Sequence, residues 1–201
     1  MVSRKERERL QRKQDIVDVA EKLFLQKGFA NVTMEQIAKE SEFSRKTLYL
    51  YFKNREDLFT LVYLKVSRLR WEILSNAMDS KEAGYDKLKA YGEAYYDFVV
   101  RYPEYFRMGM YLDHNGMNYE KISSEISKEF NTEKKLALFK LGASYRVGIK
   151  DDTLINIIDV DTNIKHFIFS LRTMLNEIVL GYENKEFYYS FLELFLNAIK
   201  K

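Results

Sequence analysis

Residues that break regular structure are scarce in this 201-residue chain, and this scarcity restricts the fold more than any other feature. Proline occurs once, at position 103, and glycine occurs eight times. A β-rich fold needs such residues at its many turns, whereas 46% of this chain is hydrophobic and can supply long amphipathic helices. The sequence therefore predicts an all-α protein of about nine helices, long enough to bury a core without covalent cross-links.

Several classes of protein are excluded by composition. Cysteine is absent, which excludes disulfide scaffolds, thiolate zinc sites and catalytic thiols. The first residues are charged and lack the apolar stretch of a signal peptide, and no window approaches the roughly 18 continuous apolar residues of a membrane span. We expect a cytoplasmic protein with no membrane partner, no cofactor and no metal.

Charge and aromatic content divide the chain into two parts. Residues 1–55 have a net charge of +5 and residues 56–201 a net charge of −2, while 24 of the 30 aromatic residues follow residue 55. A basic segment is suited to a polyanion and an aromatic segment to an apolar core or ligand. Two segments with separate tasks are the simplest interpretation.

The basic segment has the pattern of three short-spaced helices. The first helix is expected from Arg4 to Lys27 and is ended by Gly28. Thr33 and Gln36 form a capping-box pattern that starts a second helix at Met34. After a tight turn at 41–44, a third helix is expected over 45–51, and this spacing is typical of a helix-turn-helix.

The rest of the chain is expected to be helical as well. Asn54, Ser80, Asp161 and Asn184 are the predicted helix starts, and Gly148 is predicted to lie in a loop with Asp151 and Asp152. The approximate ranges are 55–78, 80–102, 103–112, 119–147, 161–180 and 184–199. The helix at 55–78 is apolar on most sides, which indicates burial between other elements.

Many residues in the basic segment agree in register with a known family signature. They are Gly28, Phe29, Thr33, Ile37, Ala38, Ser44, Thr47, Leu48, Tyr49, Tyr51, Phe52, Lys53, Glu56, Asp57, Leu58 and Phe59. This pattern resembles TetR/AcrR-type transcriptional regulators. The resemblance implies an all-helical homodimer with a DNA-binding head, here residues 1–54, and an effector-binding, dimerising body, here residues 55–201. The chain departs from the pattern at Glu42, where glycine is common, and at Lys46, where a small residue is frequent.

The helix that starts at Ser44 carries the predicted contacts with DNA. A recognition helix enters the major groove by its first turn, which places Ser44, Arg45, Lys46 and Thr47 against bases and nearby phosphates. Arg45 and Lys46 are the predicted sequence readers, and a solvated basic face is the alternative. The predicted phosphate contacts are Thr33, Tyr49, Tyr51, Lys53 and Arg55. For the two tyrosines the alternative is packing in the core.

A basic arm precedes the first buried turn of the first helix. It carries six basic residues and two acidic ones. The basic residues are Arg4, Lys5, Arg7, Arg9, Arg12 and Lys13, and the acidic ones are Glu6 and Glu8. Such an arm can follow a phosphate strand or enter the minor groove. The alternative is an exposed helix face with ion pairs four residues apart. The sequence does not decide between these two interpretations.

The aromatic segment offers candidates for a ligand cavity. The predicted effector-binding residues are Tyr63, Trp71, Tyr95, Phe98, Phe106, Met110, Phe139 and Phe167, with Arg172 or His166 as a polar contact. Each of these aromatic residues has plain core packing as its alternative. The predicted dimer interface lies on the last two helices, at Phe167, Leu171, Leu175, Phe187, Phe191 and Phe195. Closure of these faces onto the body of a monomer is the alternative.

The predicted function is that of a transcriptional repressor. It would bind a palindromic operator in double-stranded DNA as a homodimer and leave it when a small hydrophobic or aromatic effector binds. A DNA-bound architectural or cell-division protein with a protein partner is the first alternative, and a helical enzyme is the second. The chain has no recognisable catalytic motif, and we expect Asp113 and His114 to be surface residues rather than a metal pair.

Overall fold

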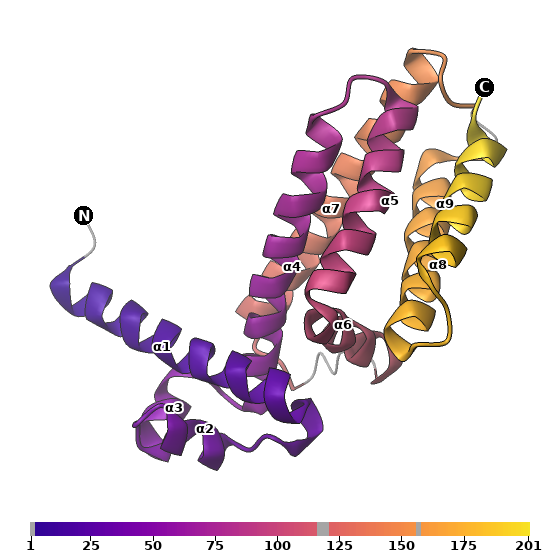
Figure 1. Ribbon diagram of the computed structural model, residues 1–201. Helices are drawn as coiled ribbons and strands as arrows, with labels where there is room; N and C mark the ends of the chain where they lie inside the picture. The colour runs from indigo at the N-terminus through magenta and orange to yellow at the C-terminus, as the bar shows by residue number, and fades with distance from the viewer. Residues whose placement is uncertain (1–2, 116–120, 156–157) are drawn as a thin grey trace. The chain divides into compact units, whose positions relative to one another are not determined.

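Helices dominate the part of the chain that the computed structural model describes, residues 3–115, 121–155 and 158–201. A short 3-10 turn, η1, spans Phe29–Asn31. The α helices are α1 (Arg4–Lys27), α2 (Met34–Glu40), α3 (Arg45–Tyr51), α4 (Arg55–Asp79), α5 (Gly84–Arg101), α6 (Pro103–Asn115), α7 (Ser124–Lys150), α8 (Val160–Leu180) and α9 (Lys185–Ile199) (Figure 1). The all-α class is therefore confirmed. Among the described helices, none is both long and apolar enough to cross a membrane.

The chain forms two compact units. The head unit comprises the described residues of Met1–Ser67 and Met108–Asn131, and the body unit comprises those of Arg68–Arg107 and Thr132–Lys201. The division falls inside α4, α6 and α7, so each of these helices belongs to both units. The predicted functional boundary at residue 54 differs from this structural division and stays a prediction.

The first three helices begin and end where local signals predict. Gly28 ends α1 with a φ of 74°, a conformation that costs glycine little. The Thr33 hydroxyl accepts a hydrogen bond from the Gln36 backbone N–H at 3.2 Å, and the Gln36 side chain accepts one from the Thr33 N–H at 2.9 Å. This capping box starts α2. Between α2 and α3, Glu42 has a φ of 58°, which is uncommon for a residue with a Cβ.

An aromatic cluster and an ion-pair cluster stabilise the head unit. Phe59 packs against Phe24 and Phe29, with ring centroids 5.4 and 4.2 Å away. On its surface, the Lys65 ammonium group on α4 lies 2.6 Å from the Glu21 carboxylate of α1. The buried side chains of Ile16, Ala20, Ile37, Leu48, Phe52, Leu58 and Val62 complete the core.

A buried carboxylate joins three parts of the head unit. Asp57, in the first turn of α4, is only 1% exposed. Its oxygens accept hydrogen bonds from the Lys53 N–H at 3.1 Å, from the Ser123 N–H at 2.8 Å and from the Ser123 hydroxyl. Beside it, the Asn54 side chain caps α4 through the Asp57 N–H and donates to the Lys121 carbonyl oxygen. The residues before α7 are thereby fixed to the segment that leaves α3.

Helices α5, α8 and α9 pack against one another in the body unit, with α8 and α9 side by side (Figure 1). Gly92 on α5 permits close approach of α9, because a Cβ there would lie 2.5 Å from a methyl carbon of Leu192. The Tyr188 hydroxyl donates to the Gly92 carbonyl oxygen at 2.8 Å, so the buried polar end of this tyrosine is satisfied. Packing and hydrogen bonding therefore fix the same pair of helices.

The predicted start of α5 at Ser80 is wrong. The helix begins at Gly84, whose N–H donates to the Asp151 carboxylate at 2.8 Å. A residue 67 positions away supplies this cap, and short-range patterns cannot show such a contact. Gly148 is also misplaced by the prediction, because it lies inside α7 and not in a loop. A Cβ on Gly84 would lie 2.1 Å from the Gly148 nitrogen, so the two backbones are in contact.

Two other helix starts also differ from the prediction. Helix α7 begins at Ser124 instead of near residue 119 and continues to Lys150; residue 119 itself lies outside the described residues. Helix α8 begins at Val160, because Asp159 and not Asp161 is its N-cap. The predicted caps at Asn54 and Asn184 and the start of α6 at Pro103 are confirmed.

The Asp57 network predicts the cost of removing this carboxylate. Asp57→Ala leaves the Lys53 and Ser123 donors without their buried acceptor, and we expect a loss of about 3 kcal/mol in the free energy of unfolding. Urea denaturation followed by circular dichroism measures it. Glu56→Ala is the matched control, because it removes a neighbouring acid whose side chain is only partly buried. Equal stability of the two variants would contradict the structural role of Asp57.

Candidate nucleic-acid interface

Helix α3 begins with a side-chain cap that orders its first turn. The Ser44 hydroxyl accepts a hydrogen bond from the Thr47 N–H at 3.1 Å, and the two hydroxyl oxygens lie 2.9 Å apart. On the inner side Leu48 is completely buried, and Phe52, just after the helix, is almost so. Arg45 and Lys46 point to the exposed side of this anchored turn. The cap and the buried leucine therefore hold two cations at the surface.

Arg45 is held in place by two neighbours. Its Nη1 lies 2.5 Å from the Glu35 carboxylate of α2, and both side chains are exposed. A hydrogen bond with Tyr49 and the charge of Glu35 raise the pKa of Arg45 above its usual value. The cation is thus oriented but accessible. Sequence reasoning missed Glu35, because its partner is ten residues away on another helix.

Other exposed groups on and after α3 surround these cations. Tyr49 is 48% exposed, whereas Tyr51 is half-buried. Lys53 is exposed just after the helix. Leu50 is 71% exposed, and sequence reasoning missed it. The signal was available, since Leu50 lies outside the buried stripe of Leu48 and Phe52.

Two of the predicted phosphate contacts have structural tasks. The exposed Thr33 hydroxyl caps α2, as described above. The Arg55 guanidinium lies 4.3 Å from the centroid of the Phe29 ring. Its Nη1 donates to the carbonyl oxygens of Phe29, Ala30 and Val32 at 2.9–3.4 Å. Arg55 therefore fixes the turn before α2 to the start of α4, and its contact with phosphate stays a prediction.

Three predicted effector residues of the body unit, Tyr95, Phe106 and Phe167, belong to a buried aromatic cluster. Tyr95 packs against Phe106 at a centroid distance of 6.3 Å, and Tyr91, absent from the prediction, packs against both Tyr95 and Phe167 at 6.0 and 5.9 Å. Phe98 is buried on the same helix as Tyr95. Burial raises the pKa of Tyr91, so this hydroxyl stays protonated. The cluster is largely apolar, with the phenol groups of its tyrosines and the Arg70 guanidinium, 5.9 Å from the centroid of the Tyr95 ring, as polar groups.

The other predicted effector residues lie elsewhere. Tyr63 and Met110 belong to the head unit, where Tyr63 packs on Phe130. Phe139 is 68% exposed and lines an open groove of about 210 Å³ between α7 and α8. It therefore does not belong to a closed cavity.

The predicted polar contacts of the body differ in burial. His166 is exposed on α8, which argues against it as a contact inside the body. Arg172 is partly buried. Its positive charge partly offsets the rise that burial causes in the pKa of Tyr91. The Trp71 indole N–H is buried and has no acceptor among the described residues. The side chains of Asp113 and His114 lie outside the described residues.

The predicted dimer residues fall into two sets. Phe167, Leu171 and Leu175 are buried within the single chain, so the prediction that they form an intersubunit surface is wrong. Phe187 is exposed on α9, and Phe191 and Phe195 are half-buried. Sequence reasoning missed several exposed apolar side chains on or near α8 and α9: Phe169, Leu180, Tyr182 and Leu194. An unpaired apolar surface is therefore present on these helices, on faces other than that of Phe167.

Known proteins match the head of this chain most clearly. The family model for "Bacterial regulatory proteins, tetR family" matches residues 16–62. An HTH-type transcriptional regulator of Mycobacterium tuberculosis is 44% identical over 68 residues, 33% of this chain and 34% of that protein. The regulator QacR of Staphylococcus aureus is 31% identical over 106 residues, 47% of this chain and 56% of QacR. The chain thus matches about a third to a half of the length of these relatives.

Solved structures extend the likeness to nearly the whole fold. The fatty acid degradation regulator FadR of Bacillus halodurans has a TM-score of 0.71 at 17% identity and covers 92% of this chain and 94% of its own. FadR of Bacillus subtilis, solved in complex with stearoyl-CoA, has a TM-score of 0.70 at 18% identity, with 92% and 98% covered. The exposed, capped helix α3 lies within the part of the head whose sequence matches these proteins. Residues 16–62 of this chain are therefore similar in sequence to TetR-family bacterial regulatory proteins, and its helical fold is similar to theirs.

Proposed function

We propose that this protein is a cytoplasmic transcriptional repressor that binds a palindromic operator and is released by a small hydrophobic effector. The observation that carries the proposal is the first turn of α3, where Ser44 caps the helix and Arg45 and Lys46 are exposed. Side chains at this place in a helix-turn-helix reach base edges in the major groove. An arginine can donate two hydrogen bonds to guanine, and a lysine can reach the same acceptors.

The surrounding side chains fit the same mode of binding. The exposed Lys53 and the hydroxyls of Thr33, Tyr49 and Tyr51 suit phosphate oxygens, which fix the register of the head without reading sequence. The exposed Leu50 is suited to the methyl group of a thymine. Since Glu35 orients Arg45 before binding, part of the entropy of ordering this side chain is lost in advance.

Dimer formation would supply the second reading head. The exposed apolar side chains of α8 and α9, including Phe169, Phe187 and Leu194, support an interface there. Two heads that occupy successive major grooves lie about 34–36 Å apart. Binding of an effector in the body would change this separation through α4, which starts in the head unit and ends in the body unit.

The body suits an effector with an apolar framework and a hydrogen-bond acceptor. The aromatic cluster around Tyr95 supplies the apolar contacts, and the Trp71 indole N–H is a buried donor without an acceptor among the described residues. Nothing in these features calls for catalysis, so the proposal does not include an enzymatic activity. Native mass spectrometry of protein purified from its own host would report dimer mass and any retained effector together.

Selection from a random duplex library tests the proposed function. The purified full chain is expected to enrich an inverted repeat whose half-site centres lie about 10 base pairs apart, or a multiple of that. Sequencing of the bound pool gives the result. Retention of DNA without any enriched repeat would contradict sequence-specific binding by a symmetric pair of heads.

Alanine variants of the two proposed readers should weaken specific binding. Arg45→Ala and Lys46→Ala are each expected to reduce affinity for the selected operator roughly 10- to 100-fold, because a base contact contributes about 1–3 kcal/mol of discrimination. Affinity for random DNA should change much less. Lys27→Ala, which removes an exposed charge at the end of α1, is the matched control. Fluorescence anisotropy titrations on both DNAs measure the difference, and unchanged operator affinity in both variants would contradict the assignment.

Glu42 offers a separate prediction, because its backbone strain and its charge can be removed independently. Glu42→Gly relieves the left-handed φ of 58° and is expected to stabilise the protein by about 0.5–1 kcal/mol. Glu42→Gln removes only the charge and should leave the melting temperature unchanged. Both variants should bind random DNA more tightly, since an anion beside the phosphates is lost. A stabilised Gln variant, or weaker DNA binding by both, would contradict this account.

A further inference from the structure

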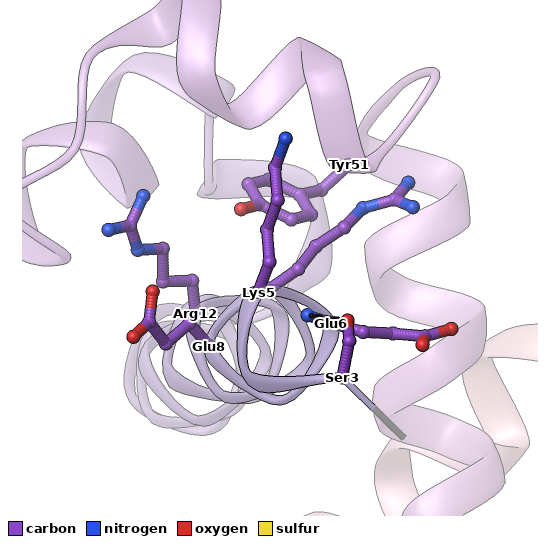
Figure 2. Close-up of a pocket in the computed structure, with 7 residues that line it drawn as sticks. Ser3, Lys5, Glu6, Glu8, Arg12 and Tyr51 are labelled. Atoms are coloured by element: carbon purple, nitrogen blue, oxygen red, sulfur yellow. Dashed lines mark hydrogen bonds between the residues drawn. The ribbon is translucent and has the colours of Figure 1, made fainter. Parts of the chain in front are cut away.

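The first ten residues of α1 form a projecting basic arm, Arg4–Lys13. Its side chains are exposed, apart from the half-buried Lys13. Figure 2 shows Lys5 on the side of this arm that faces Tyr51. A groove of about 520 Å³ lies there, lined by Ser3, Lys5, Glu6, Glu8, Arg9, Arg12 and Tyr51. Because Tyr51 is the last residue of α3, the arm and the recognition helix share this groove.

Charge pairing within the arm leaves most of its cations unneutralised. Arg4 pairs with Glu8 at 2.9 Å. Among the described residues, Lys5, Arg7, Arg9 and Arg12 have no ion-pair or hydrogen-bond partner for their side chains. The alternative of a helix face covered by internal ion pairs therefore applies to only one of the cations. The rest of the arm presents free positive charge.

Three cations of the arm are also arranged unfavourably for an isolated helix. Lys5, Arg9 and Lys13 follow one another at four-residue intervals, and like charges at this spacing destabilise a helix by about 0.2–0.5 kcal/mol per pair. Along the axis they are about 6 Å apart. Lys13 in turn lies 5.9 Å from the centroid of the Phe52 ring, directly after α3. A row of cations that leads to the recognition helix matches the regular negative charge of a DNA backbone.

We propose that the groove-facing row of the arm, Lys5, Arg9 and Arg12 with the Tyr51 hydroxyl, binds the phosphate backbone of duplex DNA next to the half-site that α3 reads. This inference rests on the proposed function, because α3 must first place the head on DNA. The arm would add affinity and salt dependence without sequence preference. It would also extend the protected length of DNA beyond the palindrome.

A charge-neutral arm variant tests the inference. Lys5→Gln, Arg9→Gln and Arg12→Gln, made together in the full chain, should reduce the slope of log K against log salt concentration by about 5 for the dimer, since each phosphate contact in its two arms contributes about 0.9. Operator affinity near 0.1 M salt should fall at least about tenfold. The control variant, Lys81→Gln with Lys134→Gln and Lys150→Gln, loses the same charge from exposed positions of the body unit. Circular dichroism checks that both variants keep their helices and melting temperature.

Duplex length gives the second readout. The difference between the wild type and the arm variant should be present on an operator with ten flanking base pairs and disappear on one trimmed to the palindrome. An unchanged salt slope, or an equal change in the control variant, would overturn the arm contact while leaving operator recognition intact. Failure of the wild type to prefer the selected operator over random DNA would instead overturn the proposed function.

Discussion

The Asp57 carboxylate is the interaction on which the geometry of the head depends. It is buried, and it collects hydrogen bonds from the segment that leaves α3 and from the residues before α7. A carboxylate bound by several donors is strongly directional, so the exit of α3 is fixed at the first turn of α4. Arg55, two residues before Asp57, fixes the turn before α2 through three carbonyl oxygens. Together they tie the turn before α2 and the segment after α3 to the first turn of α4.

Local chemistry predicted the elements of the head well, and long-range contacts explain the failures elsewhere. The capping box at Thr33 and the cap at Ser44 use neighbours within three residues, and the structure has both. The start of α5 was missed because Asp151 caps it from a distant loop. On α8, helical spacing placed Phe167 on an apolar face, but it did not show whether that face packs within the chain or against a second subunit. Periodicity gives the existence of an apolar face and leaves its partner undetermined.

The candidate site shows the same difference between features that local sequence predicts and features that depend on long-range contacts. Exposure of Arg45 and Lys46 follows from the tight turn before them, because the next buried position of the helix is Leu48. Pairing of Arg45 with Glu35 depends on how α2 crosses α3, which no local pattern encodes. The free cations of the arm were equally unpredictable, since the same alternation of Glu and Arg permits either ion pairs or an open basic face. Side-chain geometry decides between them.

Affinity cleavage of operator DNA tests the central claim, that α3 of each subunit lies in a major groove. The chain has no cysteine, so Leu50→Cys on the exposed face of α3 provides a unique attachment point for an iron chelate that cuts DNA. Two clusters of strand cleavage, related by the palindrome and one helical turn or a whole multiple apart, are the expected result. Glu82→Cys, exposed in the body unit, should give no such pair. Uniform cleavage by the Leu50 conjugate, or cuts outside the palindrome alone, would contradict the account.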